Sequence, residues 1–280
     1  MKNYLKLIRV KHWIKNFLIF IPMICSGTLT FENVISCIGA FFVFSFASSF
    51  IYIINDINDI EKDKLHPRKK NRPLPSGKIK KSTAIYIAVL MIILAITINT
   101  IINNNLLNTS LYFLLGYIII NICYSIGLKH VAIIDIVLLA SGFVIRVYYG
   151  ASIINVDVSS WLFLTIMSAS LFLGLGKRKK ELMHNKESRK VLQEYNEDFL
   201  DKFQYLSLCL TIVFYSLWSI EQSNKFMYLT IPLLIIIFMK YSLNIEKNDE
   251  GDPTTILYQD KLLMLLCLLY GIIMLMILVM

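Results

Sequence analysis

Four side chains with oxygen atoms that could bind a metal occur in the order N-D-x-x-D-x-x-x-D, at Asn55, Asp56, Asp59 and Asp63. Steps of three and four residues place the three carboxylates on one face of a helix. Neighbouring carboxylates repel one another unless a cation lies between them, and Mg²⁺ takes hard oxygen ligands together with substrate phosphates. The spacing therefore predicts a catalytic Mg²⁺–diphosphate site, in which Asn55 is a further ligand or orients the carboxylates.

The segment that follows these carboxylates is rich in cations, with R-K-K-N-R-P-L-P-S-G-K over residues 68–78. Arg68 and Arg72 are its best candidate phosphate ligands, because a guanidinium presents a fork of donors that a lysine ammonium lacks. A generic D-x-x-D is better explained as a solvated helix end with mixed charges. The full motif, followed by an arginine-rich loop, instead favours a site for a metal and a diphosphate.

The rest of the chain has the composition of a membrane protein. Its residues are 56% hydrophobic and only 17% charged, whereas a soluble domain carries roughly a quarter charged residues. Apolar runs of about twenty residues suit helices that cross about 30 Å of hydrocarbon, where backbone groups must be satisfied internally. The sequence predicts an all-α polytopic membrane protein with nine transmembrane helices, over 16–30, 33–56, 82–103, 108–126, 131–150, 158–176, 203–222, 226–245 and 261–280.

The cations are distributed unevenly between the two sets of alternating loops. Of the 28 Lys and Arg, 25 lie in the N-terminal tail and in the loop set that includes 57–81 and 177–202, whereas the opposite set contains only Lys225. Loops rich in Lys and Arg stay on the cytoplasmic side. We therefore expect one domain over residues 1–280 in the inner cell membrane, with the N-terminus and the active-site loops cytoplasmic and the C-terminus outside.

The aspartate motif resembles that of the UbiA superfamily of membrane prenyltransferases. Five separated segments resemble one branch, the decaprenyl-phosphate phosphoribosyltransferases: R-V-K-H-W-I-K-N (Arg9–Asn16), Y-S-I-G-L-K-H-V-A-I-I-D (Tyr124–Asp135), S-G-F-V-I-R (Ser141–Arg146), G-K-R-K-K-E-L (Gly176–Leu182) and G-D-P-T-T-I-L-Y-Q-D-K (Gly251–Lys261). The chain departs from the superfamily at Gly176–Leu182. There the superfamily has a second motif, D-x-x-x-D, and this chain has only Glu181 after four cations.

The resemblance implies a nine-helix UbiA-type bundle with its active site on the cytoplasmic side. The branch transfers 5-phosphoribose from 5-phosphoribosyl 1-diphosphate to a polyprenyl phosphate, with Mg²⁺ as cofactor and pyrophosphate as leaving group. Basic residues in place of the second aspartate motif suit two anionic substrates of which only one is a diphosphate. The expected partners are these substrates and the membrane, without nucleic acid, and a homo-oligomer is left open.

Further site residues follow from position and from the resemblance. Lys177 is expected to act as a catalytic cation, with Arg178 and Glu181 on the same helix end. Other candidate substrate ligands lie on the first helix and beside the loop between the fourth and fifth helices: Lys15, Asn16, Tyr124 and Lys129. For Lys15, local evidence divides evenly between holding a phosphate and reaching lipid headgroups, and the resemblance favours the phosphate.

Two charges fall inside the fifth predicted helix. Arg146 lies eleven positions after Asp135, which is about three helical turns, so both point to roughly the same side. Because an unpaired charge in lipid is costly, both should face the bundle interior. We favour an internal structural ion pair over a role in the substrate chamber, since Arg146 lies nearer the outer half of the membrane.

Two other functions remain open. An ordinary prenyltransferase acting on an aromatic or other acceptor would share the first motif, but the missing D-x-x-x-D argues against it. A non-enzymatic membrane transporter would show Mg²⁺-independent flux of a solute. Transporters rarely need three clustered aspartates beside an arginine-rich loop.

Overall fold

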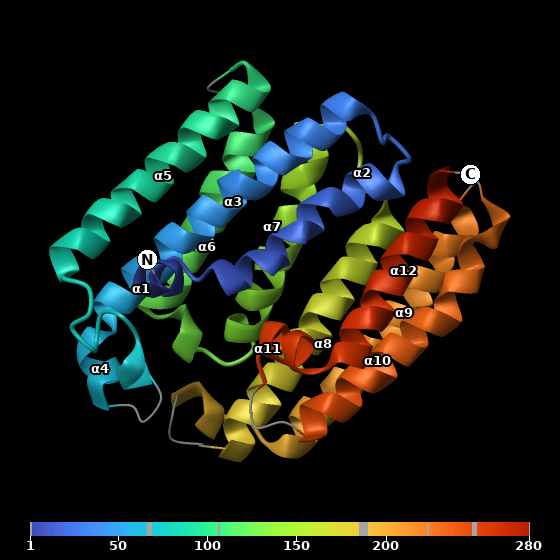
Figure 1. Ribbon diagram of the computed structural model, residues 1–280. Helices are drawn as coiled ribbons and strands as arrows, with labels where there is room; N and C mark the ends of the chain where they lie inside the picture. The colour runs from blue at the N-terminus through green and yellow to red at the C-terminus, as the bar shows by residue number, and fades with distance from the viewer. Residues whose placement is uncertain are drawn as a thin grey trace. The chain divides into compact units, whose positions relative to one another are not determined.

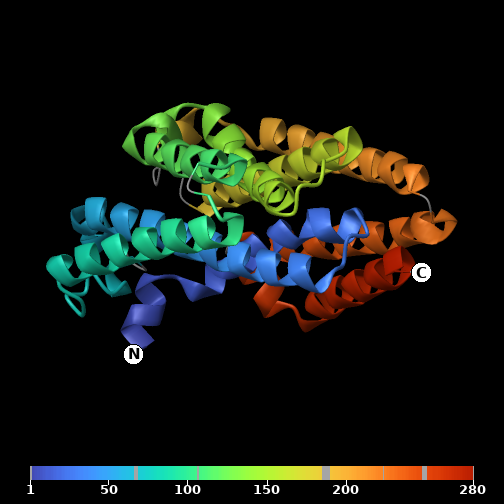
Figure 2. The ribbon, with the colours of Figure 1, turned by 90° about the horizontal axis from the view of Figure 1, so that it is seen from above.

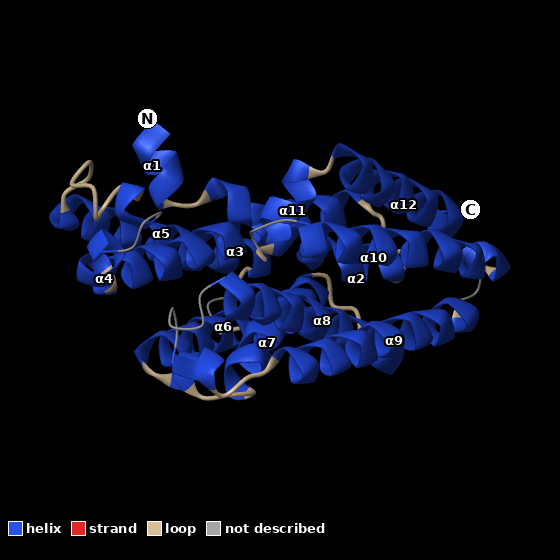
Figure 3. Ribbon diagram, turned by 90° about the horizontal axis from the view of Figure 1, so that it is seen from below, coloured by secondary structure: helices blue, strands red, loops and turns tan. Residues whose placement is uncertain are grey.

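The chain forms helices joined by short loops (Figure 1). The computed structural model describes residues 2–65, 69–105, 107–184, 190–222, 224–247 and 251–279. Within these ranges every regular element is a helix, as Figure 3 shows by colour. Among the described residues, eight helices are long and apolar enough to cross a membrane. The prediction of an all-α membrane protein is therefore confirmed.

The chain divides into two compact units, of which the first comprises Met1–Met23, Leu29–Ser125 and Ile145–Val156. Its central helix is α3, which packs along α5 and along η1; Figures 1 and 2 both show α3 beside α5. The elements of this unit are α1 (Lys2–Leu7), η1 (Val10–Phe20), the start of α2 (Ile21–Cys25), α3 (Phe31–Asn58), α4 (Ile60–Leu65), η2 (Lys69–Asn71), α5 (Lys81–Asn103), α6 (Thr109–Ile126) and the C-terminal part of α7 (Ile134–Ile153).

Aromatic packing fixes the inner face of α3. The helix begins after Thr30, whose side chain accepts a hydrogen bond from the Asn33 N–H at 3.2 Å and so caps the first turn. Further along, the buried ring of Phe44 lies 4.9 Å from the ring of Tyr117 on α6 and 4.6 Å from that of Tyr149 on α7. These contacts hold the rotation of α3, and hence the direction in which its last turn presents the aspartate motif.

The second unit comprises Ile24–Thr28, Ile126–Val144 and Asp157–Met280. In it α8 packs along α9, and α10 packs against α12. The side chain of Asn196 accepts a hydrogen bond from the Phe199 N–H at 2.7 Å and caps α9. The elements are η3 (Leu128–His130), the N-terminal part of α7, α8 (Ser160–His184), η5 (Lys190–Gln193), α9 (Glu197–Glu221), η6 (Lys225–Leu229), α10 (Thr230–Lys247), α11 (Pro253–Gln259) and α12 (Lys261–Val279).

The first predicted span differs from the structure. A single α-helix over 16–30 was expected, but the chain there forms the 3₁₀-helix η1 and then only five residues of α2. The N–H of Ile21 donates to the carbonyl of Leu18, and Pro22 has no N–H with which to continue an α-helical ladder. The prediction of a single α-helix over 16–30 is therefore wrong, and the count of nine crossings stays a prediction.

Candidate functional site

The end of α3 and the short α4 carry the aspartate motif. The helix breaks at Asp59, yet backbone hydrogen bonds continue through the break. The N–H of Asp59 donates to the carbonyl of Asn55 at 3.0 Å, and the N–H of Asp63 donates to the carbonyl of Asp59 at 2.8 Å. Near-helical spacing is thus kept, and the outer two aspartates reach a common partner.

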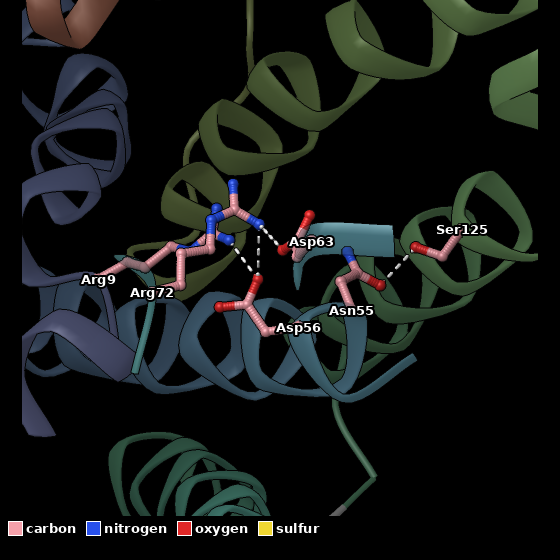
Figure 4. A network of polar contacts seen from close by, with 6 residues as sticks. All are labelled: Arg9, Asn55, Asp56, Asp63, Arg72 and Ser125. Carbon is pink, nitrogen blue, oxygen red and sulfur yellow. Dashed lines mark hydrogen bonds and ion pairs between the residues drawn. The ribbon is translucent and has the colours of Figure 1, made fainter. Parts of the chain in front are cut away.

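That partner is Arg72, whose guanidinium lies between two buried carboxylates (Figure 4). Its Nη1 is 3.2 Å from Asp56 Oδ1 and 2.6 Å from Asp63 Oδ2. The Nη2 of Arg9 donates to the same Asp56 oxygen at 2.5 Å. We refer to Arg9, Asp56, Asp63 and Arg72 as the aspartate cluster. Its two carboxylates and two guanidiniums are formally balanced in charge.

A compact turn after η2 places Arg72 in this cluster. The carbonyl of Arg72 accepts the N–H of Ser76 at 3.0 Å, and Gly77 adopts the left-handed conformation with φ +72, which glycine tolerates. Leu74 and Ile79 are buried in the same apolar cluster as α1 and α3 residues. The R-P-L-P-S-G-K sequence therefore returns the chain to the end of α3.

Two contributors to this region were missed by the sequence analysis. Arg9 has φ 52 and ψ 49, a left-handed conformation that is costly for a residue with a side chain, and its guanidinium lies 4.7 Å from the ring centroid of Tyr52. The hydroxyl of Ser125 donates to Asn55 Oδ1 at 2.6 Å (Figure 4). In the sequence Arg9 is only one of many cations in the segments predicted to be cytoplasmic, and Ser125 carries no local signal.

The donor set of the aspartate cluster fits a magnesium ion that brings its own phosphate ligands. Over the described ranges no group of three or more His, Cys, Asp or Glu side chains converges as a metal site. Mg²⁺ needs no such cage, because it is usually held by one or two carboxylates, waters and substrate phosphates. Asp56 and Asp63 are each 3% exposed and already hold cationic groups.

Asn16 lies in a different polar network of the first unit. Fully buried on η1, it donates to Ser45 Oγ at 3.0 Å and accepts from Arg146 Nε at 2.7 Å. Arg146 also donates to the Tyr117 hydroxyl at 3.0 Å. These contacts support an internal structural role for Asn16. Three other candidates remain: Lys15 and Tyr124 are half-buried on η1 and α6, and Arg68 lies outside the described residues.

The prediction of an ion pair between Asp135 and Arg146 is wrong. Eleven residues of helix separate their Cα atoms by about 16 Å along the axis, so sharing a face does not bring them into contact. Instead Asp135 Oδ2 lies 2.5 Å from Arg178 Nε, and its Oδ1 accepts from the Tyr195 hydroxyl at 2.6 Å. Burial and this hydrogen bond raise the pKa of Tyr195, so its hydroxyl remains a donor.

In the second unit the buried Arg178 also contacts the partly exposed Glu181. The Nη1 of Arg178 lies 2.5 Å from Glu181 Oε2, and the arginine side chain is fully buried between Glu181 and Asp135. Breaking such a pair would leave an uncompensated buried charge. The geometry therefore supports a structural role for both residues. Lys129, on η3, is half-buried in the same unit.

Lys177 is more exposed than Arg178 and its ion pair is longer. Its side chain is 29% exposed, and its Nζ lies 3.9 Å from Asp252 Oδ1. That distance exceeds the roughly 2.7–2.9 Å of a charge-assisted hydrogen bond. The sequence analysis did not predict the contact between Lys177 and Asp252, because Asp252 comes 75 positions later and has no recognisable spacing to Lys177.

Comparisons with known proteins match nearly the whole chain. A family model described as the UbiA prenyltransferase family matches residues 17–268. The chain is 31% identical to the decaprenyl-phosphate phosphoribosyltransferase of Mycolicibacterium smegmatis, over 94% of this chain and 88% of the relative. It is 30% identical to that of Corynebacterium glutamicum, over 94% and 83%. A solved UbiA homolog from Archaeoglobus fulgidus bound to GPP and Mg²⁺ has a similar fold, with a TM-score of 0.73, 19% identity, and coverage of 98% of this chain and 99% of that chain.

Proposed function

Because the chain belongs to the UbiA prenyltransferase family, we propose that it is a Mg²⁺-dependent integral membrane transferase that moves 5-phosphoribose from 5-phosphoribosyl 1-diphosphate to a polyprenyl phosphate. The observation that carries this proposal is the similarity, over 94% of the chain, to two relatives named for phosphoribosyl transfer to decaprenyl phosphate. The basic end of α8 supports it, since only one of the two substrates is a diphosphate that needs a carboxylate-bound metal.

The aspartate motif at the end of α3 and in α4 is proposed to bind the metal and the diphosphate, together with the arginines of the aspartate cluster. Asp56, Asp59 and Asp63 would hold Mg²⁺, with Asn55 as a ligand or orienting group. The Mg²⁺ in the Archaeoglobus homolog supports a divalent metal. When bound, Mg²⁺ would neutralise the charge that develops on the departing pyrophosphate. Arg72 already lies beside two of these carboxylates and can turn its donors to phosphate oxygens.

The remaining residues are proposed to bind phosphate rather than to transfer protons. Lys177 and Lys15 offer ammonium groups to phosphate, and we assign the same role to Arg68. Tyr124 and Lys129 are proposed to border the substrate. The acceptor phosphate is already an anion at neutral pH, so no general base is required. The ribosyl carbon reacts when it is correctly positioned and when the leaving charge is stabilised.

The test uses the purified full chain in detergent with labelled 5-phosphoribosyl 1-diphosphate, a polyprenyl phosphate and Mg²⁺. We expect a labelled lipid product that disappears with EDTA and returns when excess Mg²⁺ is added. The matched arm offers a labelled prenyl diphosphate with an aromatic acceptor. Prenyl transfer there, without product in the first arm, would overturn the substrate assignment and leave the family assignment intact.

A further inference from the structure

The residues just before α11 pack directly against the basic end of α8. A Cβ atom on Gly251 would lie 2.8 Å from Lys180 Cβ and 3.1 Å from Lys177 Cα. No side chain fits in so short a distance, so the backbone approaches α8 closely only because residue 251 is glycine. This approach places the following residue, Asp252, beside Lys177.

The four consecutive cations at this helix end have unequal contacts. Arg178 is fully buried with carboxylates at 2.5 Å, and Lys179 Nζ lies 2.6 Å from Asp201. Lys180 Nζ donates to a backbone carbonyl of α10 at 2.9 Å. Lys177 has the longest of these contacts, at 3.9 Å, and a more exposed side chain than Arg178 or Lys179. It is the cation of the four that an incoming anion reaches most readily.

Hydrogen bonds hold Asp252 in place on the side that faces away from Lys177. The hydroxyl of Thr254 donates to Asp252 Oδ2, and the carbonyl of Asp252 accepts the N–H groups of Thr255 and Ile256 at 3.0 and 3.1 Å. The other carboxylate oxygen, Oδ1, lies toward Lys177. With the Asp252 side chain 20% exposed, water and a solute anion can reach both partners of this ion pair.

We propose that Asp252 competes with a substrate phosphate monoester for Lys177. In the substrate-free protein the Asp252 carboxylate pairs with the Lys177 ammonium. A bound phosphate displaces the carboxylate from the ammonium. A loose, partly exposed ion pair contributes little stability, whereas a phosphate makes shorter and stronger contacts with an ammonium. The two anions repel one another at a single cation. This inference rests on the proposed function, which gives Lys177 a phosphate ligand.

The experiment measures binding of two probes to the full chain in detergent, by calorimetry in EDTA so that no metal contributes. The probes are ribose 5-phosphate and geranyl phosphate, which separate the donor phosphate from the lipid phosphate. Asp252→Asn should lower the Kd of one probe roughly threefold to fivefold, the range expected for releasing an exposed ion pair. Lys177→Ala combined with Asp252→Asn should lose that gain.

Asp260→Asn is the matched control, because it removes the same charge at the other end of α11 and leaves the contact between Lys177 and Asp252 intact. Its Kd should equal that of the wild type. An unchanged or higher Kd for both probes in Asp252→Asn, or an equal gain in Asp260→Asn, would overturn the competition.

A second readout does not depend on any variant. In the wild type, saturating ribose 5-phosphate or geranyl phosphate should increase hydrogen exchange of backbone amides in Thr254–Gln259, because Asp252 leaves Lys177. Unchanged exchange under saturation by both probes contradicts the inference. Failure of the proposed function is distinguishable: a gain in Asp252→Asn without a labelled lipid product from 5-phosphoribosyl 1-diphosphate would remove the donor assignment alone.

Discussion

At the scale of single residues, the three aspartates of the motif occupy different surroundings. Asp56 and Asp63 are buried and contact arginines, whereas Asp59 is half-buried in the turn between α3 and α4. Asp59 is therefore the carboxylate that an incoming hydrated ion can reach first. Its backbone N–H and carbonyl carry the hydrogen bonds that keep the motif near-helical.

Asp59→Asn is expected to reduce Mg²⁺-dependent turnover roughly 100-fold or more, the scale of losing one contact that stabilises transition-state charge. Folding should remain intact, because the substitution keeps the side-chain shape and the backbone hydrogen bonds. Turnover with labelled donor and the thermal midpoint test the two halves of this prediction. Glu61→Gln, on the exposed face of α4, is the control and should change neither quantity. Retained activity in Asp59→Asn would remove its metal assignment.

At the scale of elements, η1 and α7 approach one another within the first unit through a single glycine. A Cβ atom on Gly150 would lie 2.1 Å from the carbonyl oxygen of Ile19 and 2.9 Å from its carbonyl carbon. Both are backbone atoms and cannot rotate away. This contact brings η1 close to the helix that carries Arg146, where Asn16 and Arg146 form their hydrogen bond.

Gly150→Ala should therefore destabilise the protein by about 1–3 kcal/mol, the usual range for overpacking. Gly116→Ala on α6 is the matched control, since a Cβ there meets nothing within 4 Å and alanine favours a helix. Denaturant unfolding in detergent, followed by helical circular dichroism, measures both. Equal midpoints for Gly150→Ala and the wild type would contradict the close packing.

The ion pair between Lys240 on α10 and Asp260, just before α12, is expected to depend on pH. Lys240 Nζ lies 2.8 Å from Asp260 Oδ2, and the Leu263 N–H donates to Asp260 Oδ1 at 2.8 Å. The hydrogen bond from Lys240, followed by that from Leu263, lowers the pKa of Asp260 to about 2. Since an unfolded aspartate titrates near 3.9, this contribution to stability is present above about pH 4 and is lost as the pH falls to about 2.

Thermal midpoints of the wild type and Asp260→Asn, measured from pH 6 to pH 2, test this. The wild type should be the more stable above about pH 4, and the difference should shrink toward pH 2 as Asp260 takes up a proton. A difference that stays constant over the whole range would show that the ionised carboxylate contributes nothing.

Hydropathy was sufficient to predict eight of the helices, because lipid requires long apolar runs whatever their tertiary contacts. It could not predict the 3₁₀ winding of η1, because a 3₁₀-helix and an α-helix of the same apolar residues differ only in their backbone hydrogen bonds. The aspartate motif was recognisable because its residues are adjacent in sequence. The partners Arg9 and Asp252 were not, since each comes from a distant segment that only tertiary packing brings to the motif or to Lys177.

At the scale of the whole molecule, the 3₁₀ winding of η1 affects the number of membrane crossings. A 3₁₀-helix rises about 2.0 Å per residue, so the eleven residues of η1 extend about 22 Å. The five residues of α2 add about 8 Å. Together they match the roughly 30 Å of hydrocarbon, although neither is a long α-helix. We therefore propose that Val10–Cys25 is a ninth crossing in one transmembrane domain.

Nine crossings would place the two termini on opposite sides of the membrane, and the distribution of Lys and Arg predicts that the N-terminus is cytoplasmic. Reporter fusions in cells test this arrangement. A reporter active only in the cytoplasm should work at the N-terminus and fail at the C-terminus, and an export-dependent reporter should do the reverse. Activity of the same reporter at both ends would place both termini on one side of the membrane. That result would contradict a ninth crossing and support eight.

The surroundings of Arg146 also bear on how the chain is made. Its contacts with Asn16, Phe44 and Tyr117 are all with residues synthesised before it. When α7 leaves the ribosome, a surface that can accept its costly charge therefore already exists. Asp135 on the same helix is in the opposite situation, because Arg178 and Tyr195 are translated later. We therefore expect the N-terminal end of α7 to stay close to water until α8 has been inserted.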